Sequence, residues 1–167
     1  MQSKLRTLIL LLFLVFSRQL LAERQLNPGN VSLGLILGSP TAITPKFNLD
    51  RIHAIDAGLA YWFNDYIEIY ADYLWLYPKL TSSKKYPLNE FTPYWGLGAD
   101  LQTINRSSFI ADNRHPWTGV FLRTPLGVEF MPRKVPLGIF LELVPNINLI
   151  PGLWISLGGG LGARYYF

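Results

Sequence analysis

The sequence predicts an all-β protein: an antiparallel up-and-down transmembrane β-barrel of about eight strands, preceded by a cleavable signal peptide. Three observations support this prediction. Apolar residues alternate with small or polar ones along most of the chain, which is the period of a strand with two different faces. After residue 22, the longest charge-free stretches, 25–45 and 143–163, are interrupted by proline, asparagine and glycine, so neither has the roughly 20 predominantly apolar residues of a transmembrane helix. Only 16% of the residues are charged, whereas about 25% is usual for soluble proteins.

The first 22 residues have the features of a secretory signal. Lys4 and Arg6 precede the apolar run "TLILLLFLVF", and "SRQLLA" then ends on the small residue Ala22. We therefore expect a signal peptide at 1–22 and an outer-membrane barrel at 23–167, with an uncleaved anchor as the alternative. Removing 1–22 takes away three of the 15 basic residues and none of the 11 acidic ones. The mature chain is then almost neutral, and we expect no nucleic-acid partner.

The first four strand candidates lie between short breaks. Residues 30–38 and 42–49 are separated by Ser39-Pro40, and Asp50-Arg51 precedes the candidate at 54–63. Asn64-Asp65 then leads into 66–77, "YIEIYADYLWLY", in which apolar and polar residues alternate. A longer break follows at 78–90.

The second four candidates are longer or more strongly patterned. They are residues 94–102, 120–130, 137–144 and 153–167, and the last of them alternates throughout. The breaks between them are expected at 104–116, at Pro132 to Pro136, and at "PNINLIPG" from Pro145. With both termini on the periplasmic side, the 78–90 break becomes an unusually long periplasmic turn, because such turns are normally short.

The two faces of these strands differ in kind. One face carries no charge in any candidate, and the other is rich in glycine with single charges among the small residues. A polar face built this way suits the interior of a narrow transmembrane barrel whose apolar face meets lipid. The alternative is a soluble, lipocalin-like binder with the apolar face inside. The residues expected in an interior ion-pair network are Lys46, Asp56, Glu68, Asp72, Asp100, Arg123, Glu129, Glu142 and Arg164.

Aromatic residues gather near the expected strand ends, where membrane meets water in barrels of this type. They occur at 61–63, at Tyr73, Trp75 and Tyr77, at 94–95, and at 165–167. By parity, Tyr70 and Trp154 should instead occupy the interior beside the arginines.

The final segment "GLGARYYF" resembles the terminal strand of bacterial outer-membrane β-barrel proteins. More broadly, residues 30–167 are similar to an uncharacterised family of small eight-stranded outer-membrane barrels, through "GSPTAITPKF", "AIDAGLAY", "ADYLW", "RTPLGVEF", "GIFLELVP" and "GLGARYYF". The resemblance implies the outer membrane of a diderm bacterium, contact with its lipid, and recognition of Tyr165 and Phe167 by the barrel-assembly machinery. It implies no known activity. We expect a monomer.

Nothing in the sequence marks a catalytic centre. The chain has no cysteine, and His53 and His115 have no metal-binding spacing. Ser107, Ser108 and His115 share a loop and keep open the alternative of a lipid-modifying barrel enzyme. A narrow pore is a further alternative. We expect no cofactor, no metal and no enzymatic activity, but a structural or loop-mediated role with an interior plugged by side chains.

Overall fold

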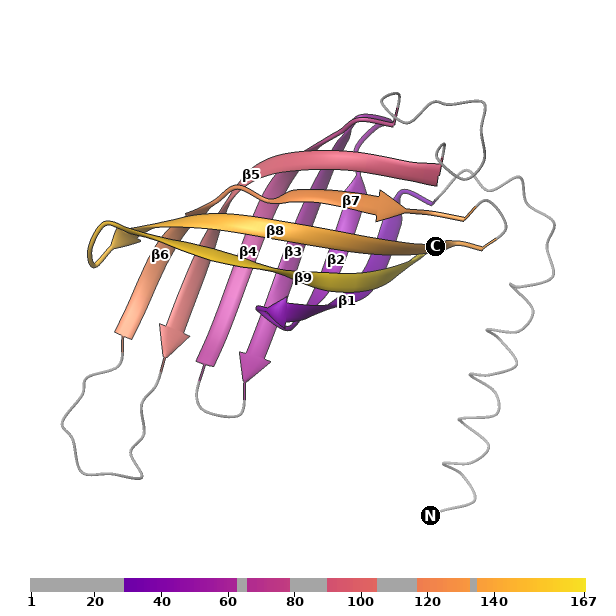
Figure 1. The fold of residues 1–167 in the computed structure, drawn as a ribbon. Helices are drawn as coiled ribbons and strands as arrows, with labels where there is room; N and C mark the ends of the chain where they lie inside the picture. Colours follow the sequence, from indigo (N-terminus) through magenta and orange to yellow (C-terminus); the bar gives the residue numbers. More distant parts are fainter. Residues whose placement is uncertain (1–28, 63–65, 79–89, 105–116, 133–134) are drawn as a thin grey trace, which may run out of the picture.

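The computed structural model describes residues 29–62, 66–78, 90–104, 117–132 and 135–167. Their strands form one antiparallel sheet that closes on itself where the first strand pairs with the last (Figure 1). The segments are β1 (Val31–Ser39), β2 (Ala42–Asn48), β3 (His53–Trp62), β4 (Tyr66–Leu76), β5 (Phe91–Ile104), β6 (Trp117–Arg123), β7 (Leu126–Phe130), β8 (Leu137–Ile150) and β9 (Trp154–Tyr166). The proposed signal peptide, 1–22, lies outside the described residues.

The nine segments occupy eight strand positions. Segments β6 and β7 both pair with β5 on one side and β8 on the other, so they form a single strand interrupted at Thr124 and Pro125. The expected strand at 120–130 is therefore present, and it begins earlier, at Trp117. The predicted all-β fold with about eight strands is confirmed.

The expected break from Pro145 to Gly152 is wrong in most of its length, because β8 continues to Ile150. Proline disrupts a central strand by lacking a ladder donor. Here the missing donor of Pro145 faces the interruption between β6 and β7, where its carbonyl accepts a hydrogen bond from the backbone N–H of Thr124 at 3.0 Å. The two irregularities thus fall opposite each other, and neither ends its strand.

The strands are staggered around the barrel. A path along directly paired residues starts at Ser156 on β9, runs once round the wall, and returns to β9 at Tyr166, ten residues further along. The path passes through Asn146, Arg123, Gly98, Asp72, Asp56, Lys46 and Ser32. Such a stagger accompanies tilted strands. Figure 1 shows β8 and β9 on the near wall crossing β2 to β4 on the far wall.

The alternation predicted from the sequence separates the two faces of the wall. Large apolar side chains point outward on every strand position, for example Leu35, Leu59, Leu97 and Leu141, each roughly half exposed. The inward side chains are buried and include most of the charged residues of the strands. Within the described residues, no helix is long and apolar enough to cross a membrane.

Glycine makes room for large rings in the lumen. A Cβ added to Gly58 would collide with the ring of Tyr70, and one added to Gly162 would collide with the ring of Phe140. These small residues lie on the inward face, opposite rings from the neighbouring strand. Their spacing allows a narrow barrel to hold bulky side chains without a wider wall.

Most outward aromatic residues gather at the end of the barrel where β1 begins and β9 ends, whereas Tyr61 and Trp154 lie at the other end. Trp95 stacks on Trp75 with ring centroids 4.5 Å apart and donates a hydrogen bond to the Tyr77 hydroxyl at 2.9 Å. Tyr73 and His53 extend this group. β4 ends and β5 begins at this same end, and most of the long turn expected between them, 79–89, lies outside the described residues.

Candidate functional site

The lumen gathers the charged residues that alternation placed on the polar face. All nine expected side chains are buried there, none with more than 5% of its residue surface exposed. They come from seven of the eight strand positions, and only β1 contributes none. They are Lys46 (β2), Asp56 (β3), Glu68 and Asp72 (β4), Asp100 (β5), Arg123 (β6), Glu129 (β7), Glu142 (β8) and Arg164 (β9).

One group, here called the Arg164 cluster, consists of Lys46, Asp56, Glu129 and Arg164. The Lys46 ammonium lies 2.7 Å from one oxygen of Glu129, and the Arg164 Nε lies 3.7 Å from the other. Arg164 also donates a hydrogen bond to Asp56 at 3.3 Å through Nη2. Thr44 donates a further bond to Asp56 at 2.6 Å. Two cations thus face two carboxylates, each with a hydrogen-bonding donor.

The second group, the Arg123 cluster, consists of Arg123, Glu68, Asp72 and Glu142. The Arg123 Nε donates to both oxygens of Asp72 at 3.2 Å, and Nη1 donates to Glu68 at 3.3 Å. Nη2 lies 3.9 Å from Glu142. One planar guanidinium therefore contacts three carboxylates, an arrangement for which its fixed fork of donors is suited.

Each of the two arginines stacks against one aromatic ring. The Arg123 guanidinium lies 3.8 Å from the centroid of the Tyr70 ring, and that of Arg164 lies 3.9 Å from the centroid of Phe140. Cation–π contact at this range favours burial of the guanidinium. The ring of Tyr70 was expected inside from its parity, and it is buried there.

Two tyrosines that alternation placed on the polar face link the charged groups. The Tyr94 hydroxyl donates to Glu142 at 2.8 Å, and the Tyr166 hydroxyl donates to Glu129 at 2.6 Å. Their association with the membrane-interface aromatics is wrong, because both rings are buried in the lumen. The expected interior place of Trp154 is also wrong: it is 47% exposed and meets Phe121 edge-on near the end of β9.

Several inward polar side chains have buried atoms without a hydrogen-bond partner among the described residues, including Ser32 Oγ and Arg164 Nε and Nη1. Asp100 accepts a hydrogen bond from Gln102 at 2.6 Å through Oδ2, and its Oδ1 has no hydrogen-bond partner among the described residues. The same holds for Oδ1 of Asn146 and for both amide atoms of Asn148. These asparagines were not predicted to face inward, because Pro145 indicated a break in the strand. Extending the alternation through that proline would have found them.

The other candidate chemistry finds little support in the described residues. No group of three or more His, Cys, Asp or Glu side chains there is placed to hold a metal ion. His53 pairs instead with Asp50 in its own turn, at 2.7 Å. Ser107, Ser108 and His115 fall at 105–116, outside the described residues.

The C-terminal residues lie at the seam that closes the barrel. Phe167 donates its backbone N–H to Val31 at 2.9 Å, and its side chain is 59% exposed on the outer surface. The ring of Tyr165 meets it edge-on, with centroids 5.3 Å apart. The two aromatics expected in the assembly signal are thus neighbours in space, beside the pairing of β9 with β1.

Comparison with solved structures identifies the same architecture. The fold is similar to the N-terminal β-barrel domain of Pseudomonas aeruginosa OprF, with a TM-score of 0.63 and 14% identity, over 84% of this chain and all of that one. A weaker likeness is to Neisserial surface protein A (NspA), with a TM-score of 0.42 and 13% identity, over 82% of this chain and 93% of that one. No protein-family model and no curated protein matches the sequence.

Proposed function

We propose that the chain is a non-enzymatic outer-membrane β-barrel protein with a structural role, or one exercised through its loops. The observation that carries this proposal is the contrast between an outer wall of apolar side chains and a lumen of paired charges. In water, so large an apolar surface would be unfavourable. In lipid it is the expected exterior, and closure of β1 on β9 leaves no sheet edge along the seam they share.

The lumen is proposed to be plugged by its own side chains. The largest fully buried residues there include Arg123, Arg164, Lys46, Phe121 and Phe140. An eight-stranded barrel has an interior just wide enough for side chains to fill it. Such filling supports a scaffold rather than the narrow-pore alternative, and single-channel recording in planar bilayers distinguishes them. We expect no stable conductance from the intact protein.

The proposed partners follow from the surface. Lipid of the outer membrane would contact the apolar wall, and the outward aromatic residues gathered at one end would lie near the headgroups. The barrel-assembly machinery would bind the C-terminal strand through Tyr165 and Phe167. Equal outer-membrane yields after deletion of Phe167 and of the loop residue Asn113 would contradict that assignment. We further propose a monomer, located in the outer membrane of a diderm bacterium.

A paired substitution tests the membrane proposal. Leu97 points outward and Asp100, three residues later on β5, points inward. Leu97→Arg should destabilise the inserted barrel by about 2–4 kcal/mol if it lies near the midplane. Asp100→Asn, as the matched control, should insert normally. The measurements are membrane fractionation, heat-modifiable migration on gels, and unfolding in lipid vesicles. A monomer that stays soluble at high concentration without detergent would overturn the proposal.

A further inference from the structure

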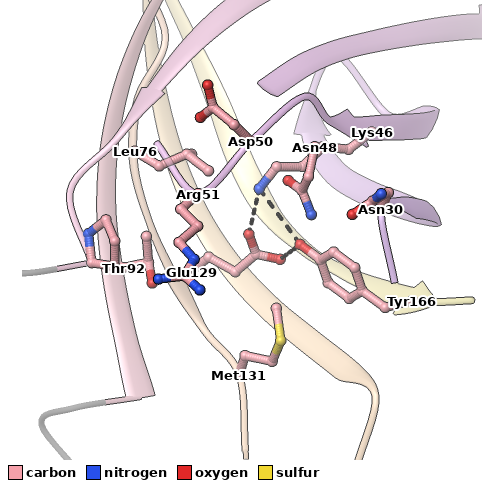
Figure 2. A pocket seen from close by; sticks show the side chains of 11 residues that line it. Asn30, Lys46, Asn48, Asp50, Arg51, Leu76, Thr92, Glu129, Met131 and Tyr166 are labelled. Atoms are coloured by element: carbon pink, nitrogen blue, oxygen red, sulfur yellow. Dashed lines mark hydrogen bonds and ion pairs between the residues drawn. The ribbon is translucent and has the colours of Figure 1, made fainter. Parts of the chain in front are cut away.

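The barrel has a pocket at the mouth where β1 begins and β9 ends. Its volume is about 550 Å³, within the range typical of small-molecule sites. The pocket is lined by the turn after β2, by the ends of neighbouring strands and by Lys46, the buried lysine of the Arg164 cluster (Figure 2). The lining residues used below are Lys46, Asn48, Asp50, Arg51, Glu129 and Tyr166.

The floor of the pocket is an ammonium group whose partners leave part of its hydrogen-bonding capacity unused. Lys46 Nζ lies 2.7 Å from Glu129 and 3.5 Å from the Tyr166 hydroxyl. An ammonium group has three donors, so one is not accounted for by these two contacts. Both oxygens of Glu129 are engaged within the lumen, since one faces Lys46, and the other accepts the Tyr166 hydroxyl at 2.6 Å and lies 3.7 Å from Arg164 Nε.

The wall of the pocket carries a second cation, Arg51. The preceding residue, Asp50, is committed to the turn: its carboxylate accepts the backbone N–H groups of Ile52 at 2.7 Å and His53 at 2.8 Å. Its other oxygen lies 2.7 Å from the His53 ring, and this hydrogen bond lowers the pKa of Asp50. The carboxylate of Asp50 therefore stabilises the turn. Arg51 forms no hydrogen bond or ion pair with any described residue, and Figure 2 shows its side chain extending into the pocket.

The unused hydrogen-bonding groups at this mouth are mainly donors on cations. The forked guanidinium of Arg51 and the spare donor of Lys46 would both favour an anion, and a guanidinium can bind a carboxylate or phosphate through two bonds at once. Among the acceptors, the side-chain oxygen of Asn48 is buried and has no hydrogen-bond partner within the described residues. It could accept an N–H or O–H from the rest of a ligand.

We propose that this pocket binds a small polar ligand through a carboxylate or phosphate group held by Arg51, with Lys46 beneath it. The proposal goes beyond the structural role above and does not depend on it, because the pocket belongs to the folded barrel itself. Carboxylates and phosphates share this recognition chemistry. The ligand could be a free anion or the headgroup of an anionic lipid, and the experiment separates these sources.

The test uses the full chain, folded in a maltoside detergent and labelled with ¹⁵N. Sodium phosphate, sodium succinate and dihexanoyl phosphatidylglycerol are titrated separately at constant ionic strength. The backbone amides of 48–52 and the arginine Nε signals are followed by NMR. We expect saturable shifts confined to the pocket. Saturation by phosphate or succinate indicates a free anion. Saturation by the lipid alone indicates a headgroup, and both outcomes support the oxyanion site.

Variants at the turn decide whether Arg51 is responsible. Arg51→Gln should weaken binding at least about tenfold, the effect of losing a charge-assisted hydrogen bond. Arg51→Lys keeps the positive charge but lacks the forked guanidinium, so its affinity should lie between those of the parent and of Arg51→Gln. Ile52→Gln is the matched control, since Ile52 lies in the same turn, its side chain is exposed and does not line the pocket, and its backbone N–H bond to Asp50 is kept; it should bind as the parent does. Arg51 is exposed, so the variants should keep the parent's dispersed spectrum. Absence of saturable shifts with all three probes, or equal affinity in Arg51→Gln, would overturn the proposal.

Discussion

The two charged clusters of the lumen solve the burial of charge in different ways. In the Arg164 cluster, Lys46 and Arg164 face Asp56 and Glu129, so cations and carboxylates are equal in number. In the Arg123 cluster, one guanidinium contacts three carboxylates. Removing charges from water is costly unless each is paired and hydrogen-bonded. The first cluster shares that task between two cations, and the second concentrates it on Arg123.

Two equally buried arginines can therefore contribute differently to the stability of the barrel. Arg123 and Arg164 are both 1% exposed and both stack on a ring. Their neighbourhoods differ in what would be left behind if the side chain were removed. Near Arg164, Lys46 still faces Glu129. Near Arg123, the carboxylates of Asp72 and Glu142 would lose the cation that they share.

The largest effect should therefore come from Arg123→Ala. We expect the free energy of unfolding to fall by about 3–5 kcal/mol, at the upper end of what breaking a buried pair costs. Denaturant unfolding of the protein in lipid vesicles, followed by tryptophan fluorescence, measures it. Arg123→Lys is the control that restores charge without the fork, and it should recover part of the loss. An unchanged stability in Arg123→Ala would mean that these carboxylates are compensated in another way.

A smaller loss is expected for Arg164→Ala, about 3 kcal/mol, because Lys46 continues to neutralise Glu129. The remaining deficit falls on Asp56, which keeps its hydrogen bond from Thr44. Adding Asp56→Asn to Arg164→Ala should restore some stability, since it removes the carboxylate that the arginine served. The same unfolding assay applies. If Arg164→Ala proved more damaging than Arg123→Ala, the comparison between the clusters would be reversed.

Two isosteric substitutions test the difference in charge balance between the Arg164 cluster and the Arg123 cluster. Glu129→Gln should cost about 2 kcal/mol, since it leaves two cations with a single carboxylate in their cluster. Glu142→Gln keeps an acceptor for Tyr94 and removes one of the carboxylates around Arg123. Its unfolding free energy should change much less, or rise. Equal losses in the two variants would argue against a difference in charge balance.

The smallest effect is expected for Asp100→Asn. Asp100 accepts a hydrogen bond from Gln102, and no ion pair within 4.0 Å joins it to a cation among the described residues. An amide of the same shape keeps an acceptor for Gln102 and removes a buried charge, so the free energy of unfolding should fall by less than about 1 kcal/mol, or rise. A loss as large as that of Glu129→Gln would show that the charge of Asp100 stabilises the lumen.

Alternation in the sequence is enough to predict the class of fold and the face on which most strand residues lie. Alternation is a local property of the extended backbone, so it assigned Arg123, Arg164 and Tyr70 to the polar face without knowledge of their neighbours. It failed where a local signal was overridden by a distant one. Pro145 looked like a strand end, and only its position opposite the interruption at Thr124 shows why the strand continues.

The tertiary structure alone decided which charges meet. Lys46 and Glu129 are 83 residues apart in the chain, and Arg164 and Asp56 are 108 apart. Their contacts depend on the register of every intervening strand pair and on the stagger around the barrel, neither of which a period of two encodes. The pocket at the mouth has the same origin, because it joins the turn at Arg51 to the ends of strands that only closure brings together. Facing is a property of one strand, whereas pairing is a property of the closed sheet.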